Sequence, residues 1–234
     1  MSIKKNIAII PARGGSKRIP HKNIRDFLGK PIITYSISTA LRCGFFDEVM
    51  VSTDSEEIAE IARSAGASVP FMRSAETSGD HATTEDVILE VLGEYKKAGR
   101  EFDYVTCIYP TAVLTTPESV TEAVHVMEEN EPAVVLPLIR YSYPPQRAFI
   151  IREDGSAAYE NPEHARTRSQ DLEPMYHDAG QFYVYNVKKL AATIEDDYYP
   201  IIVPEMDAQD IDNLSDWEMA EIKYRLKGSK KQDK

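Results

Sequence analysis

The amino-acid sequence predicts an α/β fold built on a doubly wound, mostly parallel sheet. Short apolar runs alternate with helical segments along the first part of the chain, up to about residue 138. Each run is short enough to be a strand that is buried on both faces. Such alternation is typical of a parallel sheet with helices on both sides. The length suits a single domain over 1–234.

The predicted elements follow one another at a regular pace. The strands are expected over 6–10, 49–52, 104–109, 133–138, 181–187 and 201–203. The helices are expected over 31–43, 55–65, 84–98, 117–129 and 215–226. Thr116 is a typical N-cap before Pro117, and Gly44 is a typical helix end. Ser215 and Glu218 have the spacing of a capping box, and the residues from 227 onward are expected to fray.

The alternation stops over residues 140–178. Pro144-Pro145, Asp154-Gly155 and Asn161-Pro162 mark turns in a polar and aromatic stretch that is too long for an ordinary loop. We expect this segment to form an inserted, hairpin-like lobe within the single domain. It would cover a site or contact a second subunit.

The composition excludes several classes of protein. A net charge of -11 argues against broad nucleic-acid binding, because duplex binders carry an excess of Lys and Arg. The sequence contains no apolar run of about 18 residues, so no membrane span is expected. Cys43 and Cys107 are far apart within apolar stretches, which favours reduced thiols and a cytoplasmic location.

The positive charges are concentrated at one end of this acidic chain. Every charged residue before Asp26 is basic: Lys4, Lys5, Arg13, Lys17, Arg18, Lys22 and Arg25. A wholly basic segment in an acidic protein indicates a local site for a small polyanion.

The loop after the first predicted strand combines glycines with these cations. Gly14 and Gly15 let backbone N–H groups approach a phosphate, and Arg13, Lys17 and Lys22 supply countercharge. The mouth of the first strand is also where an open parallel sheet usually binds its ligand. Neither G-x-x-x-x-G-K-[ST] nor G-x-G-x-x-G occurs, which disfavours P-loop NTPases and dinucleotide oxidoreductases. A flexible basic surface turn is the alternative.

The run from Ile10 to Pro20, IPARGGSKRIP, followed by Lys22-Asn23, resembles the signature loop of the acylneuraminate cytidylyltransferases, the CMP-sialic acid synthetase family. The resemblance implies a Rossmann-like nucleotidyltransferase that uses CTP. It implies that Arg13, Lys17 and Lys22 act in catalysis on the triphosphate. It also implies that the remaining loop residues bind the nucleotide: Pro11, Ala12, Gly14, Ser16 and Asn23, together with Arg13.

Two later segments are similar to other parts of that family. Arg73, followed by Thr84, matches the segment in which an Arg and a hydroxyl residue hold the cytosine. Asp210 and Asp212 match its metal-binding carboxylates, and alternate residues of an extended segment can face one Mg²⁺. The alternatives are a surface cation and an acidic surface loop.

The residues expected to bind the sugar are similar to the pseudaminic acid branch of the family. Tyr109 departs from the sialic acid enzymes, which usually have Gln there. An Arg fork suits the sugar carboxylate, although Arg168 could equally be an exposed cation. The candidate residues are Tyr109, Gln146, Arg147, Arg168, Gln170, Gln181 and Tyr183.

The resemblance implies transfer of CMP from CTP to the anomeric hydroxyl of a nine-carbon 2-keto sugar acid, with Mg²⁺ as cofactor and pyrophosphate as product. Pseudaminic acid is the expected acceptor. N-acetylneuraminic acid, legionaminic acid and eight-carbon Kdo are alternatives, as is a catalytically silent nucleotide-binding protein of the same fold. The family also implies a homodimer.

Overall fold

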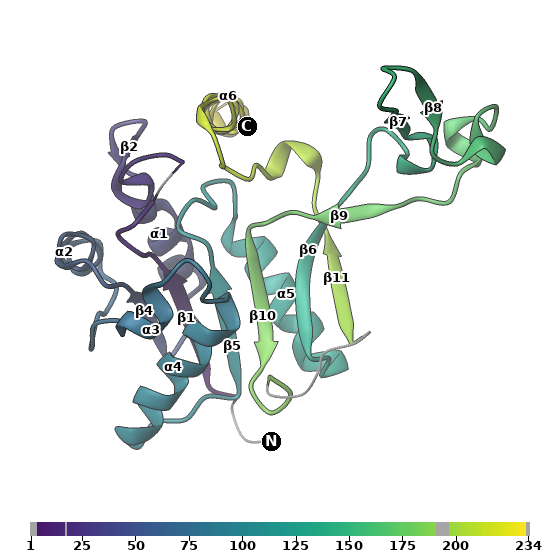
Figure 1. Ribbon diagram of the computed structural model, residues 1–234. Coiled ribbons are helices and arrows are strands. Elements are labelled where there is room, and N and C mark those ends of the chain that lie inside the picture. Colours follow the sequence, from purple (N-terminus) through teal and green to yellow (C-terminus); the bar gives the residue numbers. More distant parts are fainter. Residues whose placement is uncertain (1–3, 17, 191–196, 233–234) are drawn as a thin grey trace.

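The computed structural model describes residues 4–16, 18–190 and 197–232. Its main sheet has the strand order β11-β6-β10-β5-β1-β4, and β9 adds to β6 (Figure 1). The α/β prediction is confirmed. The strands of this sheet are β1 (Asn6–Pro11), β4 (Glu48–Ser52), β5 (Tyr104–Ile108), β6 (Val134–Arg140), β9 (Tyr176–Asp178), β10 (Phe182–Asn186) and β11 (Tyr198–Ile202).

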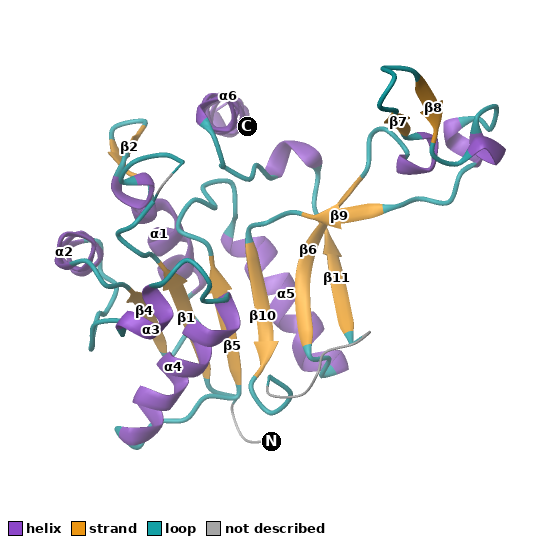
Figure 2. Ribbon diagram, viewed as in Figure 1, coloured by secondary structure: helices purple, strands orange, loops and turns teal. Residues whose placement is uncertain are grey.

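Helices cover both faces of the sheet (Figure 2). The helices are α1 (Ile33–Cys43), α2 (Glu56–Ser64), α3 (Ala75–Ser78), α4 (Thr84–Lys97), α5 (Pro117–Asn130) and α6 (Leu214–Gln232). Alternate residues of β1 belong to different cores: Ala8 and Ile10 pack with α1, α2 and α5, whereas Ile7 and Ile9 pack with α4. The fold is therefore doubly wound.

The strand directions bring several strand ends to one edge. β1 runs parallel to β4 and β5, and β11 runs parallel to β6. β10 is antiparallel to both of its neighbours, β5 and β6. The carboxyl ends of β1, β4, β5 and β6 therefore lie at the same edge as the amino end of β10. Loops at this edge can build a common site.

The first and last helices differ from the prediction at their starts. Pro31 lies in a two-residue strand, β3 (Lys30–Pro31), which pairs with β2 (Asp26–Phe27), and α1 begins at Ile33. The capping box of α6 uses Asn213 and Asp216 rather than Ser215 and Glu218. Asp216 N–H donates to Asn213 Oδ1 at 3.1 Å, and Asn213 N–H donates to Asp216 Oδ2 at 2.9 Å.

The predicted end of α6 was also too early, because the helix continues to Gln232. Its first half packs against the loop after β1. Trp217 and Tyr224 meet Phe27 edge-on, with ring centroids 5.6 and 5.8 Å apart. Ile19 and Ile211 are buried in the same cluster, so α6 joins the two ends of the chain. Within the described ranges, no helix has the length and apolarity that a bilayer crossing requires.

The segment between β6 and β9 leaves the sheet and forms the expected hairpin. Its strands are β7 (Phe149–Ile151) and β8 (Ala157–Tyr159). Short 3-10 turns flank them: η2 (Pro145–Arg147), η3 (Pro162–His164) and η4 (Ser169–Asp171). Figure 1 shows this lobe set apart from the main sheet, beyond the amino end of β9.

Candidate active site

A cleft of about 530 Å³ opens at the edge where β1 and β5 end. Its walls come from the loop after β1, the residues after β5, the start of α4 and the segment before α6. The cleft brings together many of the residues that the sequence indicated. These are Pro11, Arg13, Ser16, Lys22, Asn23, Arg73, Thr84, Tyr109, Asp210 and Asp212.

Hydrogen bonds to neighbouring groups fix the basic loop. Asn23 is buried in η1 (Lys22–Ile24), and its Nδ2 donates to the carbonyl of Arg13 at 2.9 Å. Arg13 crosses the cleft, where its Nη1 donates to Asp80 Oδ1 at 2.8 Å and to the Gly79 carbonyl at 3.3 Å. The loop is thus fastened to the segment between α3 and α4, and the guanidinium of Arg13 lies at the cleft wall.

Two residues of the loop that were expected to bind the nucleotide, Ala12 and Gly14, lie outside the lining of the cleft. Ala12 is fully buried in the core, and its N–H donates to the Ser52 carbonyl at 2.9 Å. The Gly14 N–H donates to Asp54 Oδ1 at 2.7 Å, and a Cβ at Gly14 would lie 3.2 Å from Cβ of Ser55. The structure gives both residues a part in holding the loop against β4 and α2, and neither lines the cleft.

Arg73 supplies a fixed charge at the base of the cleft. It is 9% exposed, and its Nε and Nη2 donate to Ser52 Oγ at 3.0 Å and to the Ser52 carbonyl at 2.5 Å. Burial lowers its pKa, but a guanidinium remains protonated in proteins. These two bonds orient the fork before any ligand arrives.

Thr84 and Tyr109 meet on the opposite wall. Their hydroxyl oxygens are 3.2 Å apart. Thr84 is the first residue of α4, whose capping box is made by Thr83 and Asp86. Tyr109 directly follows β5, and burial raises the pKa of its hydroxyl. Both groups are therefore neutral donors and acceptors at ordinary pH, suited to polar atoms of a base or sugar.

The acidic wall is formed by the segment before α6. Asp212 Oδ2 lies 2.6 Å from Arg18 Nη1, and its Oδ1 lies 3.9 Å from Lys22 Nζ. Lys22 also donates to the Ile211 carbonyl at 2.7 Å, and burial lowers the pKa of its ammonium group. Burial, and then the charge of Asp212, raise the pKa of Asp210. The protein has thus placed an exposed carboxylate, Asp210, and a partly exposed one, Asp212, near each other and beside two cations.

This donor set fits Mg²⁺. The ion prefers oxygen ligands and is usually held by one or two carboxylates, with waters and substrate phosphates completing its shell. Asp210 and Asp212 provide two carboxylates beside the basic loop. Among the described residues, no cluster of three or more His, Cys, Asp or Glu side chains is placed to hold a metal.

Gln181 and Tyr183, which were expected to bind sugar, lie behind the cleft wall. Gln181 is 2% exposed, and its Nε2 donates to the Asp207 carbonyl at 2.8 Å. The Tyr183 hydroxyl donates to Asp178 Oδ2 at 2.6 Å, and its ring packs edge-on against Tyr109, with centroids 5.6 Å apart. Gln181 therefore supports the segment before α6, and Tyr183 orients Tyr109.

The four candidate residues of the lobe lie outside this cleft. Gln146 Nε2 donates to the Glu173 carbonyl at 2.7 Å, and Arg147 Nη1 donates to Ser169 Oγ at 3.4 Å. Arg168 and Gln170 are exposed. One chain alone does not bring these residues to its own cleft. Lys17 lies outside the described residues.

The cleft is also lined by residues that were not among the predicted site residues, and Arg18, Asp80 and Thr111 are three of them. Arg18 stands in the basic run, and Thr111 follows Tyr109 by two positions, so both could have been proposed from position alone. The ion pair between Arg18 and Asp212 joins residues far apart in the sequence, and only the fold shows it.

A basic loop, a buried arginine and a carboxylate pair around one cleft of an open α/β sheet define a nucleotidyltransferase. The model of the Cytidylyltransferase family matches residues 7–197, and the chain belongs to this family.

Curated relatives and solved structures agree with this assignment. A pseudaminic acid cytidylyltransferase of Campylobacter jejuni subsp. jejuni is 40% identical over 228 residues, covering 95% of this chain and 97% of the relative. The CMP-N,N'-diacetyllegionaminic acid synthase of Legionella pneumophila is 32% identical, with 92% and 94% covered. The structure of CMP:2-keto-3-deoxy-manno-octonic acid synthetase complexed with CTP has the same fold. Its TM-score is 0.71 at 19% identity, with 95% of this chain and 99% of the other covered.

Proposed function

We propose that the protein transfers CMP from CTP to the anomeric hydroxyl of a nonulosonic acid, with pseudaminic acid as the acceptor and pyrophosphate as the second product. One observation carries the proposal: the basic loop after β1 and the carboxylates Asp210 and Asp212 lie side by side in the lining of one cleft. The relative from Campylobacter jejuni supports the choice of sugar, because it matches this chain over nearly its whole length.

In this reaction the chain positions two anions and neutralises developing charge. Arg73 and Thr84 hold the cytosine, because a guanidinium fork and a hydroxyl match its carbonyl and ring nitrogen. Arg13 and Lys22 neutralise the phosphates and the departing pyrophosphate, together with Lys17. The phosphates displace part of the present pairing of Arg13 with Asp80 and of Lys22 with Asp212.

Asp210 and Asp212 would hold Mg²⁺. When bound there, the ion supplies Lewis-acid chemistry: it polarises the α-phosphate and lowers the pKa of the attacking hydroxyl. The sugar would lie against Tyr109, on the side of the cleft where Tyr183 fixes the ring of Tyr109.

We propose that the protein acts as a cytoplasmic homodimer. The lobe presents large apolar side chains to solvent: Tyr143 is 89% exposed, Ile151 71% and Phe149 56%. Exposed apolar side chains that gather on one part of a protein are often covered by a partner. In a dimer, Gln146, Arg147, Arg168 and Gln170 of one lobe would approach the sugar in the partner's cleft.

The decisive experiment mixes the protein with CTP, Mg²⁺ and one of four acids: pseudaminic, legionaminic, N-acetylneuraminic or Kdo. Pyrophosphate release is expected to be fastest with pseudaminic acid. Faster release with another acid would reassign the substrate. CTP binding without release from any acid would favour a catalytically silent nucleotide-binding protein.

A further inference from the structure

Residues 204–213 connect β11 to α6 and carry Asp210 and Asp212, yet they contain only one short 3-10 turn, η5 (Glu205–Asp207). We infer that Lys223 and Lys227 of α6 are positioning residues that hold this segment in the geometry the reaction needs. The inference rests on the proposed use of Asp210 and Asp212, and it adds two residues that do not line the cleft.

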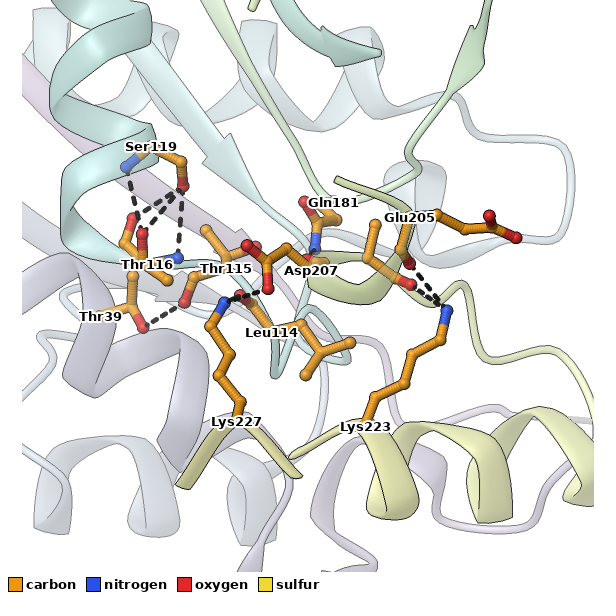
Figure 3. Close-up of polar contacts among 11 residues, drawn as sticks. Thr39, Leu114, Thr115, Thr116, Ser119, Gln181, Glu205, Asp207, Lys223 and Lys227 are labelled. Atoms are coloured by element: carbon orange, nitrogen blue, oxygen red, sulfur yellow. Dashed lines mark hydrogen bonds and ion pairs between the residues drawn. The ribbon is translucent and has the colours of Figure 1, made fainter. Parts of the chain in front are cut away.

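Lys223 fastens both ends of the 3-10 turn. Its Nζ donates to the Glu205 carbonyl at 2.9 Å and to the Ala208 carbonyl at 2.7 Å (Figure 3). The carbonyls at the end of so short a turn have few backbone partners, and hydrogen bonds from an ammonium group are stronger than neutral ones. Ala208 is 2% exposed, so its carbonyl would pay a desolvation cost without this donor. Asp210 follows only two residues later.

Lys227, one helical turn further along, connects two walls of the cleft. Its Nζ lies 2.9 Å from Asp207 Oδ1 and donates to the Leu114 carbonyl at 3.1 Å. Leu114 belongs to the loop after β5, which also carries Tyr109 and Thr111. Figure 3 shows the lysine reaching from α6 to both partners. A single ammonium group therefore couples the position of the acidic wall to that of the tyrosine wall.

Two more side chains donate hydrogen bonds to the backbone of the segment before α6. Gln181 Nε2 donates to the Asp207 carbonyl at 2.8 Å, and Lys22 Nζ donates to the Ile211 carbonyl at 2.7 Å. The carbonyls of residues 205, 207, 208 and 211 thus each accept a bond from a side chain of another element. The segment has a defined shape because neighbouring elements hold its backbone.

The first test examines the ligand-free protein by hydrogen–deuterium exchange. Lys223→Met and Lys227→Met keep most of the alkyl chain and remove the ammonium group. Arg225→Met is the control on the same helix, because Arg225 pairs with Glu221 of that helix at 3.4 Å. Amides of 205–212 are expected to exchange about tenfold faster in the two lysine variants and at the wild-type rate in the control. Unchanged exchange in both lysine variants would overturn the inference, whatever the substrate proves to be.

The second test has two parts. Binding of Mn²⁺, added alone as the probe, is measured by the loss of the EPR signal of the free ion. Steady-state kinetics then give kcat and the KM for CTP. Loss of a group that orients metal ligands from outside the coordination shell typically costs about 10- to 100-fold in metal affinity or activity. We expect such a loss in Mn²⁺ affinity and kcat, a KM for CTP within about twofold, and partial recovery in Lys227→Arg. Faster exchange with unchanged Mn²⁺ affinity and kcat would overturn the positioning role. Wild-type protein that binds no Mn²⁺ would instead remove the proposed metal site and leave the exchange result valid.

Discussion

At the scale of single residues, the cleft depends on charged groups that their neighbours hold in place. Arg73 is held by Ser52 at the base of the cleft, and Asp210 lies beside Asp212, where burial raises its pKa. Arg73 brings a positive charge with hydrogen-bond donors to the cleft, and the two aspartates bring negative charge to it. Ionisable groups with shifted pKa values in a cleft are common in active sites.

Substitution of Asp212 by Ala is expected to lower kcat at least about 10³-fold, since it removes a carboxylate placed for the transition state. The fold is expected to persist, because the backbone N–H of Asp212 still donates to Asp216. Pyrophosphate release and circular dichroism measure the two effects. Glu128→Ala, which removes an exposed carboxylate from α5, serves as the control. Near-normal turnover in Asp212→Ala would contradict the metal assignment.

The thiol of Cys43 provides a prediction about pH. Burial raises its pKa to about 11, and its Sγ donates to the Thr39 carbonyl at 3.3 Å. A raised thiol pKa means that the thiolate forms only as the pH approaches 11. Alkylation by iodoacetamide at pH 8 is expected to be about 100-fold slower than in urea-unfolded protein, and to accelerate between pH 9 and 11. Equal rates in folded and unfolded protein would refute this.

Single residues also show what a sequence can reveal. Arg13, Lys22 and Asn23 could be proposed because they are neighbours in one loop with a distinctive composition. The role of Gln181 could not, since its partner, the Asp207 carbonyl, belongs to another element. A side chain that contacts a ligand and one that supports the ligand's neighbours can have the same sequence context.

At the scale of elements, most boundaries were predictable because the signals are local. Thr116 caps α5 and Gly44 ends α1 as expected. The antiparallel direction of β10 was not predictable, because it depends on the path of the chain through the lobe. The N-cap of α6 was misjudged by two residues, because Asn213 and Ser215 are both good caps and only the structure shows that Asn213 accepts the Asp216 N–H.

The cap of α6 can be tested with these two residues. Asn213→Ala is expected to lower the free energy of unfolding by about 1 kcal/mol, the usual cost of losing an N-cap. Ser215→Ala is expected to cost much less, because its hydroxyl only donates to Asn213 Oδ1. Urea denaturation measures both. A larger decrease in the free energy of unfolding for Ser215→Ala than for Asn213→Ala would support the capping box at Ser215 that the sequence suggested.

At the scale of the whole molecule, the sheet and its helices carry the cleft, and the lobe extends away from them (Figure 1). A second copy of the chain that packs against the lobe would bury its exposed apolar side chains. This arrangement separates the cleft, which is proposed to bind the nucleotide, from the lobe, which is proposed to contact a second subunit.

Replacement of both Tyr143 and Ile151 by Ser is therefore expected to shift the protein from dimer to monomer, because it removes two of the most exposed apolar side chains of the lobe. Sedimentation velocity over a range of concentrations measures the shift. Leu89→Ser, which removes an exposed leucine from α4, is the matched control and is expected to leave the dimer intact. A monomeric wild-type protein, or a dimer that tolerates the double change, would contradict the proposed interface.

The pairing of β6 with β9 has a consequence for how this protein could change over time. Leu138, Ile139 and Arg140 pair with Asp178, His177 and Tyr176, and the Tyr141 N–H donates to the Met175 carbonyl at 3.0 Å. The chain thus leaves the sheet and returns to it at one point, as a hairpin does. A two-residue turn could close that hairpin and omit everything between. Evolution, or an engineer, can therefore exchange this appendage for another module while the nucleotide-binding half keeps its sequence.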